Sequence, residues 1–520
     1  MKSSLSASTW LGAAALIVLA AILTLNRLGA APVCGVNEAV EGVFLQQMVE
    51  PGHLLFPLDN GSEPMYKPPL FHWSAVAIDH LAAIHRISAF NLRLPAALYA
   101  IATVALTIGF TATALDGSCA LLAGLILVSS YQFVSQGRIG RVDMTLTFFE
   151  ALSLFAFCWW IKAREQARPR FSELWRHYLL AAALGLGVLA KGPVGALLPG
   201  ATIVLFLLME RRARELFALL RPGPLFLGAA LACAWYAICL FGRRYSFLDR
   251  QLGSENVGRF FGSLGFMPID YYLQPLLLNA GPLSLLIPVA AITALIRSRR
   301  PEKRDSESGA NRKECVRLFA LFWFVTALFF ELAAYKRKSY LLPLWPPSAI
   351  LLAWWTLGVA APRWRWATAA IATLCGCLIV GNFFYIPWRE VRDCDSQMSF
   401  AQALRWPIAS LRGQAVVPAD PLRRAALQID RVVAPDQPLF AFDFNASIEP
   451  LGFYLRRTVP LKSGPLASLP PGYVLIPRAV WVRNRDAKGF TPLLTMDYRH
   501  GLLLLRHDHA PVPSMQNGAG

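Results

Sequence analysis

The chain has 520 residues, of which 55% are hydrophobic and 16% are charged, and its mean hydropathy is +0.44. This is too apolar for a soluble protein, and apolar runs of membrane-spanning length recur as far as residue 386. The formal net charge of +18 does not indicate a nucleic-acid-binding protein, because the chain has no basic, aromatic-laced soluble module. It predicts basic cytoplasmic loops and anionic lipid-linked partners instead.

Eleven apolar runs are long enough to cross a bilayer. The first run is longer than the apolar region of a usual signal peptide and many others follow it, so we expect an uncleaved anchor. The fold class is therefore an all-α polytopic membrane protein with about 11 to 13 transmembrane helices. The runs lie at residues 9–31, 92–113, 117–135, 142–161, 178–190, 193–209, 222–241, 272–296, 316–334, 339–358 and 366–386.

Basic connections predict the orientation of these spans. Residues 162–176, 210–221 and 297–317 are rich in Lys and Arg, and the positive-inside rule assigns all three to the cytoplasm. If the N-terminus is also cytoplasmic, the moderately apolar segment 71–85 cannot span. We expect it to form an interfacial or re-entrant helix within a long first outer loop, residues 32–91.

The remaining connections fall on the outer side and carry cations there. This distribution opposes the positive-inside bias and indicates an anionic ligand. Lys67 stands on a backbone stiffened by Pro68 and Pro69, close in sequence to Tyr66 and Trp73. The outer cations are Lys67, Arg138, Arg141, Lys191, Arg243, Arg244, Arg259, Lys336, Arg337 and Lys338.

Carboxylates on the outer side are candidates for chemistry. Glu38 and Glu41 share one face of a predicted amphipathic helix, a pattern that a solvated helical face also produces. Asp143 follows two arginines at the start of a span, where charges are costly unless they pair or line a wet cavity. A structural ion pair and a site role both fit Asp143. Lys191 likewise fits a snorkelling lysine or a ligand contact.

The sequence changes character after residue 386. Short β-type runs then alternate with Pro and Gly turns, which predicts a small soluble α/β domain over residues 387–520 beside a membrane domain over residues 1–386. If the N-terminus is cytoplasmic, the eleven spans that follow it place this domain on the outer side. Cys34 and Cys394 would be the two cysteines well outside the bilayer, and the sequence leaves open whether they form a disulfide.

The predicted inventory suits two classes of protein. Transfer of a sugar from a lipid phosphate needs a carboxylate to take the acceptor proton and cations to steady the leaving phosphate. A transporter or flippase for an anionic lipid-linked substrate would use the same cations. The residues alone leave both classes open.

An ordered series of short motifs resembles a known family. An acidic pair after the first span is followed by "YKPPLFHW" (66–73), "GRIGRVDM" (137–144), "AKGPVG" (190–195), "ENVGRF" (255–260) and "YKRKSYLLPLWP" (335–346). This series is similar to that of the membrane glycosyltransferases related to protein O-mannosyltransferases and to the lipid A aminoarabinose transferase, the ArnT-like proteins. The likeness covers residues 10 to about 386, and its motifs are weak singly but strong together.

The resemblance implies a GT-C fold and a sugar donor carried on polyprenyl (undecaprenyl) phosphate. It implies transfer to a lipid, glycan or protein acceptor at the periplasmic face of a bacterial inner membrane. It also implies that Glu38 is the candidate base, that Asp143 lines the catalytic cavity and that Lys67 faces the donor phosphate. Further candidates for substrate binding are Tyr66, Arg138, Arg141, Lys191, Glu255, Asn256, Arg259, Lys336 and Arg337.

The chain departs from the family pattern at three places. Many relatives begin the acidic motif with Asp-Glu, where this chain has Asn37 and Glu38. The aminoarabinose branch has a glutamate at the position of Tyr66 and a histidine after the "ENVGRF" segment, where residues 261–272 contain none. These two residues can hold a metal in that branch, so we expect neither a metal nor another cofactor here. Asn37 alone motivates a third possibility, a non-catalytic scaffold.

Overall fold

The computed structural model describes residues 6–50, 52–59, 63–81, 87–166, 169–263, 265–273, 275, 281–297, 307–362, 366–394, 421–444, 448–496 and 501–507. The chain forms two compact units, which we call the helical unit and the sheet unit. The helical unit comprises Met1–Leu28, Tyr66–Ile78 and Arg93–Ile386, and the sheet unit comprises Gly29–Met65, Asp79–Leu92 and Pro387–Gly520.

The helical unit consists of α-helices with short 3₁₀ and π segments between them. Three of its helices, α3, α4 and α18, continue into the sheet unit along the chain. The α-helices are α1 (Ala7–Leu25), α3 (Leu70–Leu81), α4 (Ala89–Ala114), α5 (Gly117–Ser129), α6 (Tyr131–Gln136), α7 (Asp143–Glu165), α8 (Arg170–Lys191), α9 (Val194–Met209), α10 (Ala213–Leu219), α11 (Pro222–Phe241), α12 (Tyr245–Leu248), α13 (Arg259–Phe261), α15 (Leu286–Arg297), α16 (Glu307–Leu332), α17 (Trp345–Trp355) and α18 (Ala367–Arg392). The other segments are η1 (Asp249–Gly258), η2 (Gly281–Leu285), η3 (Lys338–Leu344) and η4 (Thr356–Ala360).

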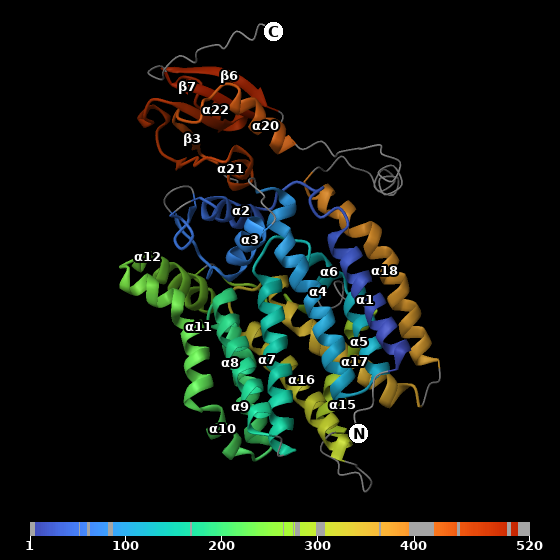
Figure 1. Ribbon diagram of the computed structural model, residues 1–520. Helices are drawn as coiled ribbons and strands as arrows, with labels where there is room; N and C mark the ends of the chain where they lie inside the picture. The colour runs from blue at the N-terminus through green and yellow to red at the C-terminus, as the bar shows by residue number, and fades with distance from the viewer. Residues whose placement is uncertain are drawn as a thin grey trace. The chain divides into compact units, whose positions relative to one another are not determined.

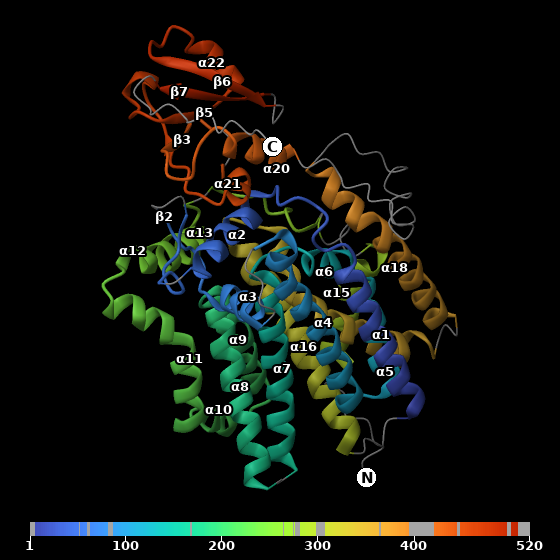
Figure 2. The same ribbon diagram turned by 45° about the horizontal axis from the view of Figure 1, so that its top comes forward.

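The helices of this unit pack lengthwise (Figures 1 and 2). Helix α7 lies along α8, α11 lies along the same α8, and α17 packs against α5 and α16. Among the described residues, seven helical segments are long and apolar enough to cross a membrane, and three shorter apolar helices accompany them. The chain is therefore a multi-pass membrane protein.

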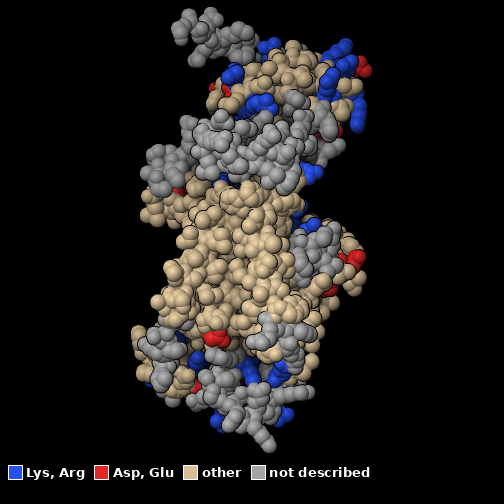
Figure 3. All heavy atoms as spheres, turned by 90° about the vertical axis from the view of Figure 1, so that its right-hand side faces the viewer, with Lys and Arg blue, Asp and Glu red and all other residues tan. Residues whose placement is uncertain are grey.

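Uncharged residues cover the side of the helical unit that is seen in Figure 3, and charged side chains gather below them. A belt without charges is what the hydrocarbon core of a bilayer requires of a protein surface. Within the unit the packing is aromatic: Phe110 stacks on Phe155 with ring centroids 4.2 Å apart, and both rings contact Phe319 edge-on. These contacts join α4, α7 and α16.

Ion pairs join the three basic connections at one end of the helical unit. Arg164 contacts Glu173 and Glu215, each at 2.5 Å. Arg212 contacts Glu165 and, at 3.2 Å, Glu314. Segments 162–176, 210–221 and 297–317 therefore share one side, as their charge predicts, although residues 298–306 lie outside the described part.

The sheet unit has an α/β core. Its five-stranded sheet has the order β4-β3-β5-β7-β6, in which β3 pairs parallel with β4 and β5 while β7 pairs antiparallel with β5 and β6. The strands of the unit are β1 (Leu58–Asp59), β2 (Glu63–Pro64), β3 (Leu439–Phe442), β4 (Leu461–Lys462), β5 (Tyr473–Pro477), β6 (Phe490–Met496) and β7 (Leu502–His507). Its helical segments are α2 (Val36–Met48), α20 (Pro421–Asp430), α21 (Glu449–Leu455), α22 (Arg478–Arg483) and η5 (Leu466–Ser468).

Both faces of this sheet are covered by apolar side chains. Strand β5 is buried along its length because Tyr473 and Leu475 point into one hydrophobic cluster and Val474 and Ile476 into another. The first cluster takes in α20 and α21, and the second takes in α22 through Val480. The predicted α/β domain is thus confirmed.

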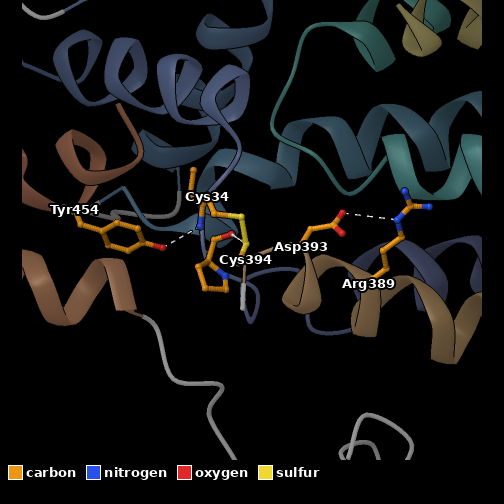
Figure 4. Close-up of a disulfide and its surroundings, with 7 residues drawn as sticks. Cys34, Arg389, Asp393, Cys394 and Tyr454 are labelled. Carbon is orange, nitrogen blue, oxygen red and sulfur yellow. Dashed lines mark hydrogen bonds and ion pairs between the residues drawn. A yellow bond between two sulfur atoms is a disulfide. The ribbon is translucent and has the colours of Figure 1, made fainter. Parts of the chain in front are cut away.

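A disulfide between Cys34 and Cys394 ties the segment after α1 to the end of α18 (Figure 4). Beside it, the backbone N–H of Val33 donates to the Tyr454 hydroxyl at 2.9 Å. Arg389 and Asp393 form an exposed pair on α18, 3.7 Å apart. The bond that the sequence left open is therefore present.

The helices agree with the predicted spans, whereas the domain boundary differs in part. Each predicted span contains helix, including 178–190 within α8, although residues 274 and 276–280 of the span 272–296 lie outside the described part. Segment 71–85 gives the short helix α3, with residues 82–86 not described. The sheet unit resumes at residue 387 as predicted, but it also takes in Gly29–Met65 and Asp79–Leu92. We had assigned those segments to the membrane domain.

Candidate active site

A cavity of about 340 Å³ opens in the helical unit among η1, α9, α16 and the segment before η3. One part of its wall is cationic and contains Lys67, Lys191 and Arg259, together with the carboxylate Glu255. Apart from the predicted binding residue Asn256, the rest is mainly apolar and aromatic, and it is formed by Pro193, Val194, Leu197, Leu252, Val257, Phe260, Phe261, Phe329, Phe330 and Ala333. The cavity thus joins a cationic end to a hydrophobic wall.

Lys67 is held at this cavity by its neighbours in sequence and by one carboxylate. The Pro68–Pro69 pair limits the backbone before α3, so that the lysine precedes the helix in a restricted conformation. Its Nζ lies 2.8 Å from Oε2 of Glu255 and 5.4 Å from the ring centroid of Tyr66. The side chain is buried. Lys67 is therefore a fixed cation on the cavity wall.

Glu255 connects two cations of the wall. Its carboxylate accepts from Lys67 and, at 2.8 Å, from Nη2 of Arg259 one turn later. Burial would raise the pKa of Glu255, but Lys67 and Arg259 outweigh it and lower that pKa. Burial, together with Arg259 and Lys191, lowers the pKa of Lys67 to about 8, although Glu255 opposes the change. The ammonium of Lys67 therefore loses its proton near a pH of about 8.

Asp143 forms a second charged group beside the same cavity. As the first residue of α7, it lies where the helix dipole favours a negative charge. One carboxylate oxygen contacts Nζ of Lys191, and the other lies 3.2 Å from Nη2 of Arg141. Asp143 and Lys191 are both buried. The carboxylate thus holds Lys191 at the cavity wall.

A glycine turn places Lys191 next to η1. Helix α8 ends at Lys191, and Gly192 has φ +94°, a left-handed conformation that favours glycine. A Cβ at Gly192 would lie 2.8 Å from Nε2 of Gln251 and 3.2 Å from Nδ2 of Asn256. The motif "AKGPVG" therefore needs glycine at this position, both for its backbone angle and for the close approach of η1.

Tyr340 links the two charged groups. Its hydroxyl accepts from Nη1 of Arg259 at 3.1 Å, and its ring lies 4.7 Å from Nζ of Lys191. Tyr335 also lines the cavity, and the guanidinium of Arg259 lies 5.3 Å from its ring centroid. We did not identify either tyrosine from the sequence. Tyr335 and Tyr340 flank the charged residues of the motif "YKRKSY". This position, five residues apart on either side of the charges, was the signal in the sequence that could have identified them.

Several predicted binding residues lie elsewhere in the helical unit. Nη1 of Arg138 donates to the backbone carbonyls of Leu23, Thr24 and Asn26, so this buried side chain caps the end of α1. Lys336 lies 3.4 Å from Oε1 of Glu331, and the guanidinium of Arg337 lies 5.4 Å from the ring centroid of Tyr335. These contacts give Arg138 a structural task, and substrate roles for all three cations stay predictions.

Glu38 belongs to the sheet unit. It lies in the first turn of α2, where its backbone N–H donates to the Gly35 carbonyl, and its side chain is buried. Glu41 is also buried on the same helix. The role of Glu38 as a base therefore stays a prediction that rests on its motif.

The described residues contain no group of three or more His, Cys, Asp and Glu side chains that could hold a metal ion. His85, one of the histidines near the motif lysine, lies outside this part of the chain. The expectation that no cofactor is needed stays a prediction.

Helices surround a cavity with a charged end and an apolar wall in this polytopic membrane protein, and its likeness to solved structures gives it a GT-C fold. The chain is similar in fold to the crystal structure of ArnT from Cupriavidus metallidurans bound to undecaprenyl phosphate. The TM-score is 0.74 with 16% sequence identity, over 96% of this chain and 98% of that one. The apo structure of the same ArnT gives a TM-score of 0.72 with 17% identity over the same shares.

Sequence comparisons agree with the fold. The family described as dolichyl-phosphate-mannose-protein mannosyltransferase matches residues 65–240. An uncharacterized protein of Aquifex aeolicus is 29% identical over 335 residues, 64% of this chain and 61% of that protein. The undecaprenyl phosphate-alpha-4-amino-4-deoxy-L-arabinose arabinosyl transferase of Erwinia tasmaniensis is 32% identical over 240 residues, 45% of this chain and 40% of the transferase.

The matches span about two fifths to three fifths of these relatives' lengths. Together with the fold, they show that the chain is similar to the protein mannosyltransferases and to the ArnT proteins. The resemblance of its motifs is thereby confirmed.

Proposed function

We propose that the protein is a glycosyltransferase that moves a sugar from a polyprenyl phosphate carrier to an acceptor of the cell envelope. One observation carries this proposal: the cavity of the helical unit combines buried cations with a wall of apolar and aromatic side chains. A lipid phosphate has the matching parts, an anionic head and a hydrocarbon chain. Undecaprenyl phosphate is part of the name of one similar transferase and is bound in the similar ArnT structure, which supports the same carrier.

The cations have a defined task in this reaction. Lys67, Lys191 and Arg259 would bind the phosphate, while Glu255 and Asp143 keep them at the wall. The polyprenyl chain would lie along aromatic residues such as Phe260 and Phe329–Phe330. Cations fixed in advance stabilise charge that develops in the transition state without reorganising.

The bond changes follow from the donor. An acceptor hydroxyl or phosphate oxygen attacks the anomeric carbon of the sugar, and the bond between this carbon and the phosphate oxygen breaks. The lipid phosphate leaves with the electron pair, so its charge grows beside Lys67 and Arg259. Where the acceptor is a hydroxyl, its proton passes to a carboxylate, for which Glu38 and Asp143 are the candidates.

We also propose that the cavity and the sheet unit face the periplasm of a bacterial inner membrane. The Cys34–Cys394 disulfide supports this, because such bonds persist in oxidising compartments. An alkaline phosphatase fusion after residue 520 should be active in intact cells, and a fusion within residues 210–221 should be inactive. The reverse pattern would contradict the orientation.

Mass profiling of envelope lipids, glycans and glycoproteins from a deletion strain tests the function. Loss of one defined sugar, restored by the wild type but not by equally expressed Asp143→Asn or Lys67→Ala, is the expected result. A deletion that changes no envelope glycan would contradict the proposal. The flipping of an anionic lipid that survives Asp143→Asn but not Lys67→Ala would instead favour a transporter.

A further inference from the structure

A second cavity, of about 360 Å³, lies entirely within the sheet unit. It is bordered by α2, by the segment that follows it as far as Leu58, and by the C-terminal end of α21. We call it the polar cavity. Its size is at the lower end of the range of small-molecule sites. The cavity of the helical unit shares no wall residue with it.

A close approach of two helices builds the polar cavity. A Cβ at Gly42 of α2 would lie 2.6 Å from Cδ2 of Phe453 on α21, so only glycine allows this packing. The side-chain Nε2 of Gln46 donates to the Phe453 carbonyl at 2.9 Å and fixes the same two helices. The wall is therefore determined by packing between segments that are about 400 residues apart.

The lining of the polar cavity carries more polar groups than that of the first cavity, beside the apolar Val43 and Leu58. Gln47 bonds through both ends of its amide to the backbone of Leu58, which holds the segment after α2 against the helix. The side chains that carry donors, acceptors or charge are Gln46, Gln47, Glu50, His53, Arg456, Arg457 and Thr458. These side chains include both hydrogen-bond donors and hydrogen-bond acceptors.

Two consecutive arginines give the polar cavity its positive charge. Arg456 ends α21 with φ +53°, a left-handed conformation that is uncommon for any residue except glycine. Arg457 donates from Nη1 to the Ala434 carbonyl at 3.0 Å and from Nη2 to the Gln437 carbonyl. The guanidinium of Arg457 is thus held in place, and the exposed Arg456 donates from Nη2 to the Ile87 carbonyl at 3.4 Å. Glu50 is the carboxylate of the lining.

We propose that the polar cavity binds a short saccharide that carries a phosphate or carboxylate group. The carboxylate of Glu50 and the hydroxyl of Thr458 match the hydroxyls of a sugar, and the guanidinium groups match the anionic substituent. The proposal rests on the function proposed above in one respect, because it makes this saccharide part of the acceptor. The anionic saccharide could be free or the head group of a glycolipid.

Calorimetry on the full-length protein in nanodiscs tests this site without any transfer step. The probes are N-acetylglucosamine 6-phosphate, neutral N-acetylglucosamine and inorganic phosphate. We expect the phosphosugar to bind at least about tenfold more tightly than either other probe, since only it engages both kinds of group. The same phosphosugar on an acyl chain, incorporated in the nanodisc, distinguishes a glycolipid by a further gain in affinity.

Matched variants locate the binding. Arg456→Asn removes the cation but suits the left-handed backbone, so we expect normal thermal unfolding and about tenfold weaker binding. Glu50→Gln should weaken binding of the phosphosugar by about two- to fivefold, through loss of an acceptor for sugar hydroxyls. Arg424→Gln, at an exposed position of α20, is the control and should leave the affinity unchanged.

Two outcomes would overturn the site. Equal affinity for phosphosugar and inorganic phosphate would reduce it to a basic surface, and equal losses in Arg456→Asn and Arg424→Gln would place binding elsewhere. Specific binding by a protein that transfers no sugar would leave this site standing and remove the proposed function. Transfer of a sugar by a protein that does not bind the phosphosugar specifically would remove this site and leave the proposed function standing.

Discussion

The two ends of α7 show two uses of charge in one membrane protein. At its last turn, four arginines pair with five glutamates across α7, α8, α9, α10 and α16. At its first residue, Asp143 and nearby Glu255 are surrounded by four cations, Lys67, Arg141, Lys191 and Arg259. Among the described ion pairs at the two ends of α7, only those near Asp143 contain more cations than carboxylates and adjoin a cavity.

The difference teaches how to separate structural charges from functional ones. The arginines of the first group are matched by carboxylates, so they join helices and attract no further anion. The second group has two more cations than carboxylates, and its Lys67, Lys191 and Arg259 are buried, where a cation is costly unless a ligand or a partner meets it. Basic content alone would not have distinguished the two ends, because both carry four cations.

The largest effect is expected on sugar transfer, when the carboxylates at the two ends of α7 are replaced one at a time. Asp143→Asn should lower sugar transfer by about 10²- to 10⁴-fold, because it removes a candidate base and releases Lys191 and Arg141. Glu165→Gln, the matched change at the other end, should leave transfer within about twofold. Initial rates in proteoliposomes at equal protein content measure both. Equal losses in the two variants would erase the distinction.

A smaller effect is expected from pH. The pKa of Lys67 is lowered to about 8, so its ammonium is present below pH 8 and is lost as the pH rises through that value. We therefore expect kcat/KM for the lipid donor to fall about tenfold between pH 7 and pH 9. Lys67→Arg should abolish this fall, because a guanidinium stays charged. An unchanged profile in Lys67→Arg would show that another group titrates.

The smallest effect concerns stability at the paired end. Arg164 bridges Glu173 and Glu215, and all three side chains are partly buried. Arg164→Gln should lower the free energy of unfolding by about 1–2 kcal/mol, between the values of exposed and buried pairs. Donor binding should stay unchanged. Thermal unfolding in detergent measures the first quantity, and a variant that binds less donor without unfolding earlier would contradict this assignment.

Much of the fold could be predicted because membrane spans are local features. The run at 142–161 becomes α7, and Gly192 with Pro193 separates α8 from α9 where the sequence breaks. The sheet unit was harder to predict. The packing of α2 on α21 joins positions about 400 residues apart, and no local pattern in residues 32–91 indicates it. The sequence therefore does not show that segments from both parts of the chain form the sheet unit.

The candidate site was predictable where single residues carry its charge. Lys67, Lys191, Glu255 and Arg259 do lie on one cavity. Tyr340 was missed because its task arises from contacts with two other segments. The charge of Arg138 suggests a substrate contact, yet its guanidinium donates to backbone carbonyls at the end of α1. Sequence shows which side chains are charged, but tertiary contacts decide which charges are already matched.

The central claim is that the cations lining the cavity of the helical unit, Lys67, Lys191 and Arg259, receive a lipid phosphate. The most direct test measures the affinity of the protein in nanodiscs for undecaprenyl phosphate and for undecaprenol, its uncharged analogue, by native mass spectrometry. The account predicts at least a tenfold preference for the phosphate, lost in Lys67→Ala and kept in the paired-end variant Arg317→Gln. Equal affinity of the wild-type protein for the two lipids would contradict it.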